Sequence, residues 1–214
     1  MTDSYLTIKA SSTGEYSEKR SKFLAFAFHV DTPEEVKVLV GQHEREYYDA
    51  RHVCYAYMLG HQREQFRAVD NGEPSGTAGK PILGQILKAE LTDILIIVVR
   101  YFGGIKLGTS GLINAYKQAA FEAISNAEIE ERTVNDVIQV SFEYPLMNEV
   151  MRVVKELNPT ILNQDFQLDC SLTLQIRRND CEQLATRLGQ IRGVTTKISG
   201  CADRASAHPS QEYN

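Results

Sequence analysis

The spacing of apolar residues divides the first 130 residues into strands and helices that alternate along the chain. Short runs rich in β-branched and aromatic residues predict strands. These predicted strands cover residues 5–10, 23–30, 52–59, 65–69 and 94–101. The last one is the most distinctive, because Ile94–Val99 is apolar at every position, which is typical of a strand buried on both faces.

Helices are predicted where apolar residues recur every three or four positions. The first begins after Thr32, with Pro33 at the first helical position, where a missing backbone N–H costs nothing. One face of this helix gathers its apolar and aromatic side chains, which are Val36, Leu39, Val40, His43 and Tyr47. Two further helices are predicted over about residues 80–89 and 109–127.

The second half of the chain has a different order of elements. After a polar stretch over residues 126–136, which is predicted to be a linker, the pattern is strand, helix, strand, strand, helix, strand. The predicted bounds are 137–142, 146–157, 160–164, 168–176, 180–188 and 194–198. This is the β-α-β-β-α-β order of ferredoxin-like domains. We therefore expect an α+β protein with domains at residues 1–130 and 131–202, and a disordered polar tail at 203–214.

Composition adds bounds on the class of protein. The 214 residues carry a net charge of −5, which argues against a protein held to nucleic acid by bulk charge alone. The longest apolar run is too short to span a membrane, and the first residues lack the pattern of a signal peptide. The four cysteines, which are Cys54, Cys170, Cys181 and Cys201, have no metal-site spacing. Buried free thiols and a cytoplasmic location are the expectation.

Two glycine-dense motifs, residues 70–81 and 100–112, contain seven glycines next to cations, acids and hydroxyls. Clustered glycines mark positive φ angles or a close approach of the backbone to another group. The first motif is not a phosphate-binding P-loop, because Pro74 stands where the leading glycine would be and Pro81 where the hydroxyl would be. Neither motif matches the dinucleotide-binding glycine pattern.

The second motif joins the buried strand to a helix and predicts an anion site. Free N–H groups at the start of a helix attract anions, and two cations flank the double glycine. The predicted anion- or nucleic-acid-binding residues, with one lysine from the first motif, are Lys80, Arg100, Gly103, Gly104, Lys106, Gly108, Thr109 and Ser110. The alternative is structural: Thr109 or Ser110 caps the helix, and the double glycine forms a tight turn.

The first motif holds two carboxylates three residues apart, Asp70 and Glu73. Such a pair can bind a metal or act as acid and base, but more often it accepts hydrogen bonds from the N–H groups of its own loop. A nucleophilic triad of His52, Asp70 and Ser75 is the least favoured alternative, because the serine lacks the G-x-S-x-G setting. The residues that line this motif without an assigned role are His52, Asp70, Glu73, Ser75, Gly76 and Thr77. No catalytic residue, metal or cofactor is predicted.

Three segments resemble a known family. His52 with Cys54, residues 70–81 and residues 98–112 are similar to the IMPACT family in its bacterial YigZ-type branch. The resemblance implies that the first domain folds like the second domain of ribosomal protein S5, a four-stranded sheet with two helices on one side. It implies a ferredoxin-like second domain, as in the last domain of translocation elongation factors. Eukaryotic relatives regulate translation, and the resemblance supplies no catalytic residues.

These observations lead to three hypotheses for function. The first is a cytoplasmic, translation-associated binding protein that contacts RNA or the ribosome through the two glycine-rich motifs, without enzymatic activity. The second is an enzyme that acts on a phosphorylated or nucleotide-like small molecule. The third is a regulator that binds a translation-related protein. No membrane partner is expected.

Overall fold

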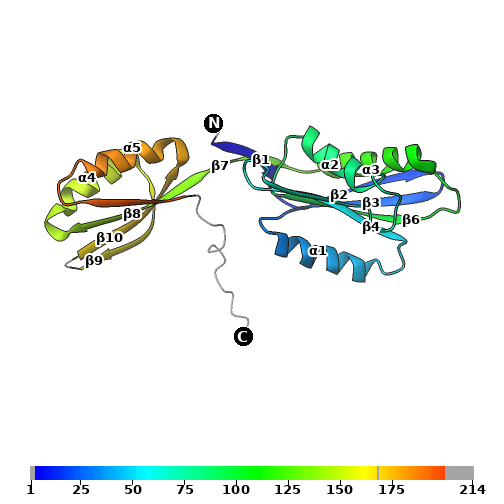
Figure 1. Cartoon of the computed structure of the whole chain (residues 1–214), viewed down its shortest axis with the longest axis horizontal. Helices are drawn as coiled ribbons and strands as arrows, with labels where there is room; N and C mark the ends of the chain where they lie inside the picture. Colours follow the sequence, from blue (N-terminus) through cyan, green and yellow to red (C-terminus); the bar gives the residue numbers. More distant parts are fainter. Residues whose placement is uncertain (1–2, 168, 201–214) are drawn as a thin grey trace. The chain divides into compact units, whose positions relative to one another are not determined.

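A computed structural model describes residues 3–167 and 169–200 of the chain. These residues form two compact units (Figure 1). The N-terminal unit spans Tyr5–Arg132, and the C-terminal unit begins at Thr133 and also includes Asp3 and Ser4. The tail at 203–214, predicted to be disordered, and Cys201 lie outside the described residues.

The N-terminal unit is built on a five-stranded sheet in the order β2-β3-β6-β4-β5. Its neighbouring strands are all antiparallel. The strands are β2 (Ser12–Glu18), β3 (Ser21–His29), β4 (His52–Leu59), β5 (Gln65–Val69) and β6 (Ile94–Tyr101). As its apolar sequence predicted, β6 lies in the middle of the sheet and is buried from Ile94 to Arg100.

Helices cover both faces of this sheet, as Figure 1 shows. On one face α2 (Gly79–Lys88) and α3 (Gly108–Ser125) enclose the larger core. On the other, α1 (Pro33–Glu46) packs through Val36 and Val40 onto alternate residues of β4 and β6. The α+β class is confirmed, but the four-stranded sheet with helices on one side alone is wrong in detail. A central strand that is apolar on both faces requires cover on both.

The structure confirms one predicted helix start and contains two strands that the sequence did not predict. The start of α1 is confirmed, because the Thr32 hydroxyl accepts a hydrogen bond from the Glu35 N–H. The strand β2 was not predicted, because it is an edge strand with polar residues at most positions. The expected linker at 126–136 contains the strand β7 (Ile129–Thr133), which pairs with β1 (Ser4–Ile8) in a separate two-stranded sheet.

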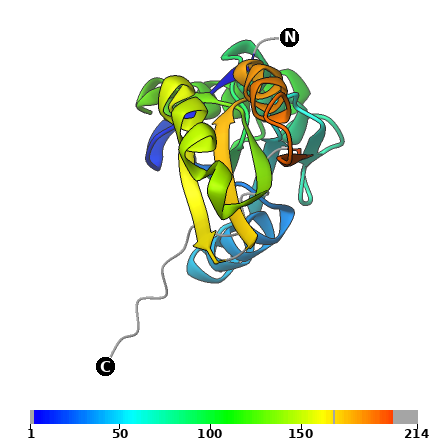
Figure 2. The same cartoon turned by 90° about the vertical axis from the view of Figure 1, so that its left-hand side faces the viewer.

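The C-terminal unit has the predicted β-α-β-β-α-β order. A 3-10 turn (Tyr144–Leu146) precedes its first helix, and its strands form a sheet in the order β11-β8-β10-β9. Its elements are β8 (Asn135–Glu143), α4 (Met147–Leu157), β9 (Thr160–Phe166), β10 (Asp169–Arg177), α5 (Arg178–Gly189) and β11 (Thr195–Ser199). Both helices lie on one face (Figure 2), where they bury the apolar side chains of β8 and β10. The buried free thiols are confirmed for Cys54, Cys170 and Cys181.

Candidate functional site

The two glycine-dense motifs meet at one end of the N-terminal sheet. His52, at the start of β4, is the register partner of Arg100, near the end of β6. The first motif leaves β5 and folds back over this end, so that its Glu73 carboxylate contacts the Arg100 guanidinium. Residues from both motifs thus form one site, in which Glu73 and Arg100 are 27 residues apart in the sequence.

Glu73 is the centre of this site. One of its oxygens, Oε1, accepts hydrogen bonds from Arg100 Nη1 at 2.6 Å and from the Tyr116 hydroxyl at 2.9 Å. His52 Nε2 lies 3.9 Å from the same oxygen. The Glu73 side chain is only 3% exposed, so its charge depends on these partners in place of water.

Arg100 was predicted to be a surface cation that contacts phosphates, and its surface location is wrong. The residue is 6% exposed and forms an ion pair with Glu73. Its guanidinium carbon lies 5.5 Å from the ring centre of Phe23 and 5.7 Å from that of Phe102, within the range of cation–π contacts. Its position in the buried central strand explains the error: alternate residues of β6 face the larger core, even where one of them is charged.

Asp70 shapes the first motif from within. Its carboxylate accepts hydrogen bonds from the N–H groups of Gly76, Ala78 and Gly79, two of them at the start of α2. Burial acts to raise the pKa of Asp70, but these N–H groups outweigh that effect and hold the pKa below 3.8, its ordinary value. The structure therefore favours the loop-bonding role for Asp70 over a role in metal binding or catalysis.

His52 does not form the triad considered above, because the Asp70 carboxylate is occupied by backbone N–H groups. His52 Nδ1 lies 3.0 Å from the carbonyl oxygen of Asn71, so this nitrogen carries the hydrogen. Ser75 is exposed, and the nearest carboxylate recorded for His52 is that of Glu73. His52 is a partly buried residue at the rim of the Glu73–Arg100 pair.

Cys54 and Tyr116 close the inner side of the site. The Cys54 sulfur lies 2.8 Å from the carbonyl oxygen of Asp70 and 3.4 Å from the Tyr116 hydroxyl. Burial raises the pKa of the Cys54 thiol to about 12, and burial likewise raises the pKa of Tyr116. A thiol with such a pKa is protonated at neutral pH and is a poor nucleophile. Tyr116 therefore supports Glu73 directly and Cys54 packs behind it, and the Cys54 thiol is not suited to nucleophilic chemistry.

The other residues predicted to bind anions are on the surface. Lys80, Lys106, Gly108, Thr109 and Ser110 are all exposed. The helix α3 begins after Leu107 without a side-chain cap, so capping by Thr109 or Ser110 is wrong. Free N–H groups at the exposed first turn of a helix, beside a lysine, have the properties of an anion site.

The two adjacent glycines of the second motif are needed for different structural reasons. A Cβ at Gly103 would lie 2.0 Å from the backbone carbon of Arg20, so the close approach of two chain segments requires glycine. Gly104 has open space around it but a φ of +85°. In the turn that leads from β6 toward α3, close packing of two backbone segments therefore requires glycine at position 103. At position 104, any residue with a side chain would have a strained backbone.

The remaining residues of the first motif serve the loop. Thr77 is buried, and its hydroxyl donates to the carbonyl oxygen of Pro74. Gly76 has a φ of +78°. Over the described ranges, no three His, Cys, Asp or Glu side chains come together as a metal site would require. None of the helices in those ranges is long and apolar enough to cross a membrane.

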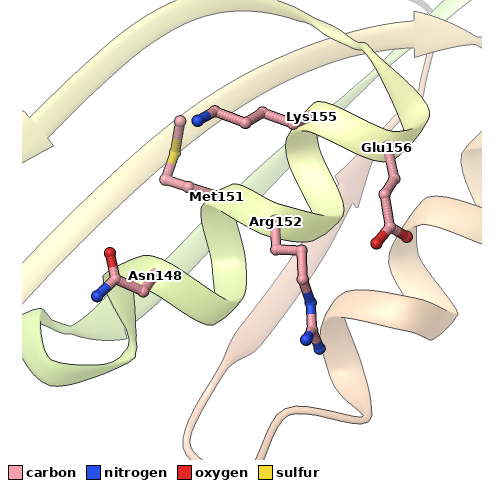
Figure 3. Close-up of a pocket in the computed structure, with 5 residues that line it drawn as sticks. All are labelled: Asn148, Met151, Arg152, Lys155 and Glu156. Carbon is pink, nitrogen blue, oxygen red and sulfur yellow. The ribbon is translucent and has the colours of Figure 1, made fainter.

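The C-terminal unit carries a shallow hollow of about 380 Å³ along α4 (Figure 3). Figure 3 shows Lys155 and Met151 next to each other on one side of the helix, while Arg152 and Glu156 project toward α5. Glu156 forms an ion pair with Arg187 of α5. Because its lining comes from a single helix, this hollow offers a ligand few converging groups.

Sequence reasoning missed three members of the site. Tyr116 was not predicted to contact Glu73, and Phe23 and Phe102 were not predicted to lie near Arg100. The sequence did contain one indication of such a neighbour: Arg100 is a charged residue in the otherwise apolar strand β6, so it requires an adjacent side chain that can interact with its charge. Only the pairing of β3 with β6 identifies that neighbour.

The fold and the site define a class of protein: two α+β units, the first of which joins two glycine-dense motifs around a buried Glu–Arg pair. Residues 19–124 match the model of the Impact N-terminal domain. A family member of Haemophilus influenzae is 32% identical over 198 residues, 92% of this chain and 93% of the relative. The protein YigZ of Escherichia coli is 34% identical over 77% of this chain and 82% of its own.

A solved structure of a hypothetical protein aligns with most of this chain. It is 29% identical, covers 94% of this chain and 99% of its own, and gives a TM-score of 0.71. The chain belongs to the IMPACT family, in its YigZ-type branch.

Proposed function

We propose that this chain is a translation-associated regulator whose N-terminal unit binds RNA or the ribosome. The translation role is what membership of the family implies. The surface that we assign to binding, which we call the α3 entry surface, consists of Phe102 and the exposed residues 104–106 and 108–110. The observation that carries the proposal is the uncapped first turn of α3, exposed beside Lys106.

The chemistry of the α3 entry surface suits a nucleic-acid backbone. Free N–H groups and the positive end of the α3 dipole attract a phosphate, and Lys106 adds a full charge. Phe102 is 45% exposed, which leaves part of its ring open to stack on an unpaired base. Lys80, exposed near the start of α2, supplies a second cation from the other motif.

The Glu73–Arg100 pair has a supporting role in this proposal. It ties the first motif to the end of β6, from which the α3 entry surface continues. The net charge of −5 favours binding through this local surface over binding through the whole molecule.

Co-sedimentation with ribosomes from the protein's own cell extract, across a salt series, tests the proposal. We expect retention at low salt that declines as salt rises, and lower retention for Lys106→Ala. Lys37→Ala is the control, because Lys37 is also an exposed lysine, with a side chain 76% exposed, in the helix that covers the opposite face of the sheet. Absence of retention at low salt would refute ribosome binding.

A further inference from the structure

The Nε–H group of the buried Arg100 guanidinium lacks an acceptor within the described part of the chain. Nη1 is bonded to Glu73, but Nε has no hydrogen-bond partner among the residues that the structure describes. This nitrogen is inaccessible to solvent, and the residue as a whole is 6% exposed. Native proteins rarely leave a buried charged donor in this state, so a missing partner is a reasonable cause.

The position of this Nε–H group points to a particular kind of partner. Nε and Nη2 form the side of a guanidinium on which carboxylates and phosphates bind with two parallel hydrogen bonds. Glu73 contacts Nη1, which is not part of that side. The Glu73 contact therefore holds the guanidinium in place through Nη1 and does not occupy Nε, one of the two nitrogens of that side.

The two aromatic rings beside Arg100 indicate how a ligand would enter. Phe23 is completely buried and is fixed in the core of the sheet. Phe102 is 45% exposed, and its ring centre lies 5.7 Å from the guanidinium carbon. An exposed side chain changes rotamer within nanoseconds, so Phe102 can uncover Arg100 without a change in the backbone.

We propose that Arg100 binds the acid group of a small molecule, a carboxylate or a phosphate, beneath Phe102. Glu73 acts as the positioning residue, because it fixes the guanidinium through Nη1. His52 lies at the rim, with its Nε2 3.9 Å from Glu73 Oε1 and its side chain 14% exposed, where it can contact the rest of the ligand.

This site is separate from the α3 entry surface in its donors. RNA binding there uses exposed cations and helix N–H groups, whereas the small-molecule site uses a buried guanidinium. The proposal does not rest on RNA binding, and a failed ribosome experiment would leave it standing.

The test is a titration followed by the NMR signal of the Arg100 Nε–H group, which reports on this nitrogen directly. Sodium phosphate and sodium acetate are added separately to the full chain, and sodium chloride keeps the ionic strength constant. We expect the signal to move and to saturate with at least one of the two anions, and which anion saturates it identifies the acid group. The Nε–H of Arg45, which donates to the carbonyl oxygen of Gly41 within α1, serves as the internal control that should not saturate.

Two variants separate binding at Arg100 from general effects. Phe102→Ala removes the cover, so we expect an apparent Kd about threefold lower or better, because less of the protein is then in a closed state. Lys37→Ala, a change at an exposed lysine of α1, should leave the titration unchanged. A shift no larger than that caused by chloride, in both the wild type and Phe102→Ala, would overturn the proposal. Movement caused by short single-stranded RNA, but by neither small anion, would also overturn it.

Discussion

Replacement of Glu73 by alanine removes the acceptor on which two neighbours, Arg100 and Tyr116, depend. The Arg100 guanidinium would keep its charge in a buried position, with Nη1 and Nε both without an acceptor. The Tyr116 hydroxyl would lose its acceptor as well. Removal of one partner of a buried ion pair costs about 3–5 kcal/mol, a large part of the 5–15 kcal/mol that holds a typical domain folded.

The free energy of unfolding should be measured for the N-terminal unit alone, since the two units need not unfold together. Amide signals of β6, followed in a urea titration, report on this unit, because β6 is the central strand of its sheet. We expect Glu73→Ala to lower the free energy of unfolding by about 3–5 kcal/mol. Glu73→Gln, which retains an oxygen acceptor for Arg100, should lower it by less.

A matched double variant identifies the cause of the loss. In Glu73→Ala/Arg100→Met no charge is left buried, so the double variant should be more stable than Glu73→Ala alone. A loss below about 1 kcal/mol for Glu73→Ala, the magnitude of an exposed pair, would refute the argument that water does not reach this site. A double variant that is less stable than the single one would refute the role of the uncompensated charge.

Three other predictions concern the two motifs and Cys54, which contacts the first of them. Asp70→Asn should cost about 1–3 kcal/mol at neutral pH, because the amide nitrogen cannot accept an N–H bond. Because the pKa of Asp70 is depressed in the folded protein, the stability that its carboxylate contributes is present above pH 3.8 and is lost as pH falls through the folded pKa. In urea titrations, the difference in stability between wild type and Asp70→Asn should therefore shrink at acidic pH and not at high pH. Gly103→Ala should destabilise more than Gly104→Ala in thermal unfolding, because the first forces a Cβ into a neighbouring backbone whereas the second adds only φ strain of about 1 kcal/mol; equal effects would contradict the close approach. In the native protein at pH 7.5, iodoacetamide should leave Cys54 unmodified for as long as the fold persists, because burial raises its pKa to about 12, and mass spectrometry that found rapid alkylation there would contradict this.

The sequence predicted most elements of the fold because their signals are local. The apolar run of β6, the Thr32 cap and the stripes of the two C-terminal helices each depend on neighbouring residues alone. Polar edge strands such as β2 and β7 have no comparable pattern, because their stability comes from pairing with distant strands. The sequence therefore could not indicate these strands.

The candidate site was predicted only in part for the same reason. The motifs were evident from their glycines, and Lys106 and Ser110 are exposed, while their role in anion binding stays a prediction. The burial of Arg100 was not predicted, because a charged residue suggests a surface until its partner is known. That partner, Glu73, is 27 residues away and comes close only through the antiparallel register of β4 with β6 and the return of the first motif.

The salt dependence of RNA binding tests the central claim most directly. Binding of a labelled single-stranded RNA should be measured by fluorescence anisotropy at several salt concentrations, for the wild type, Lys106→Ala and the control Lys37→Ala. Each phosphate contact contributes about 0.7 to the slope of log K against log salt for single strands, so we expect Lys106→Ala to reduce the slope by about that amount. Lys37→Ala should leave the slope unchanged. Equal slopes for all three proteins, or no binding at low salt, would contradict phosphate recognition at the start of α3.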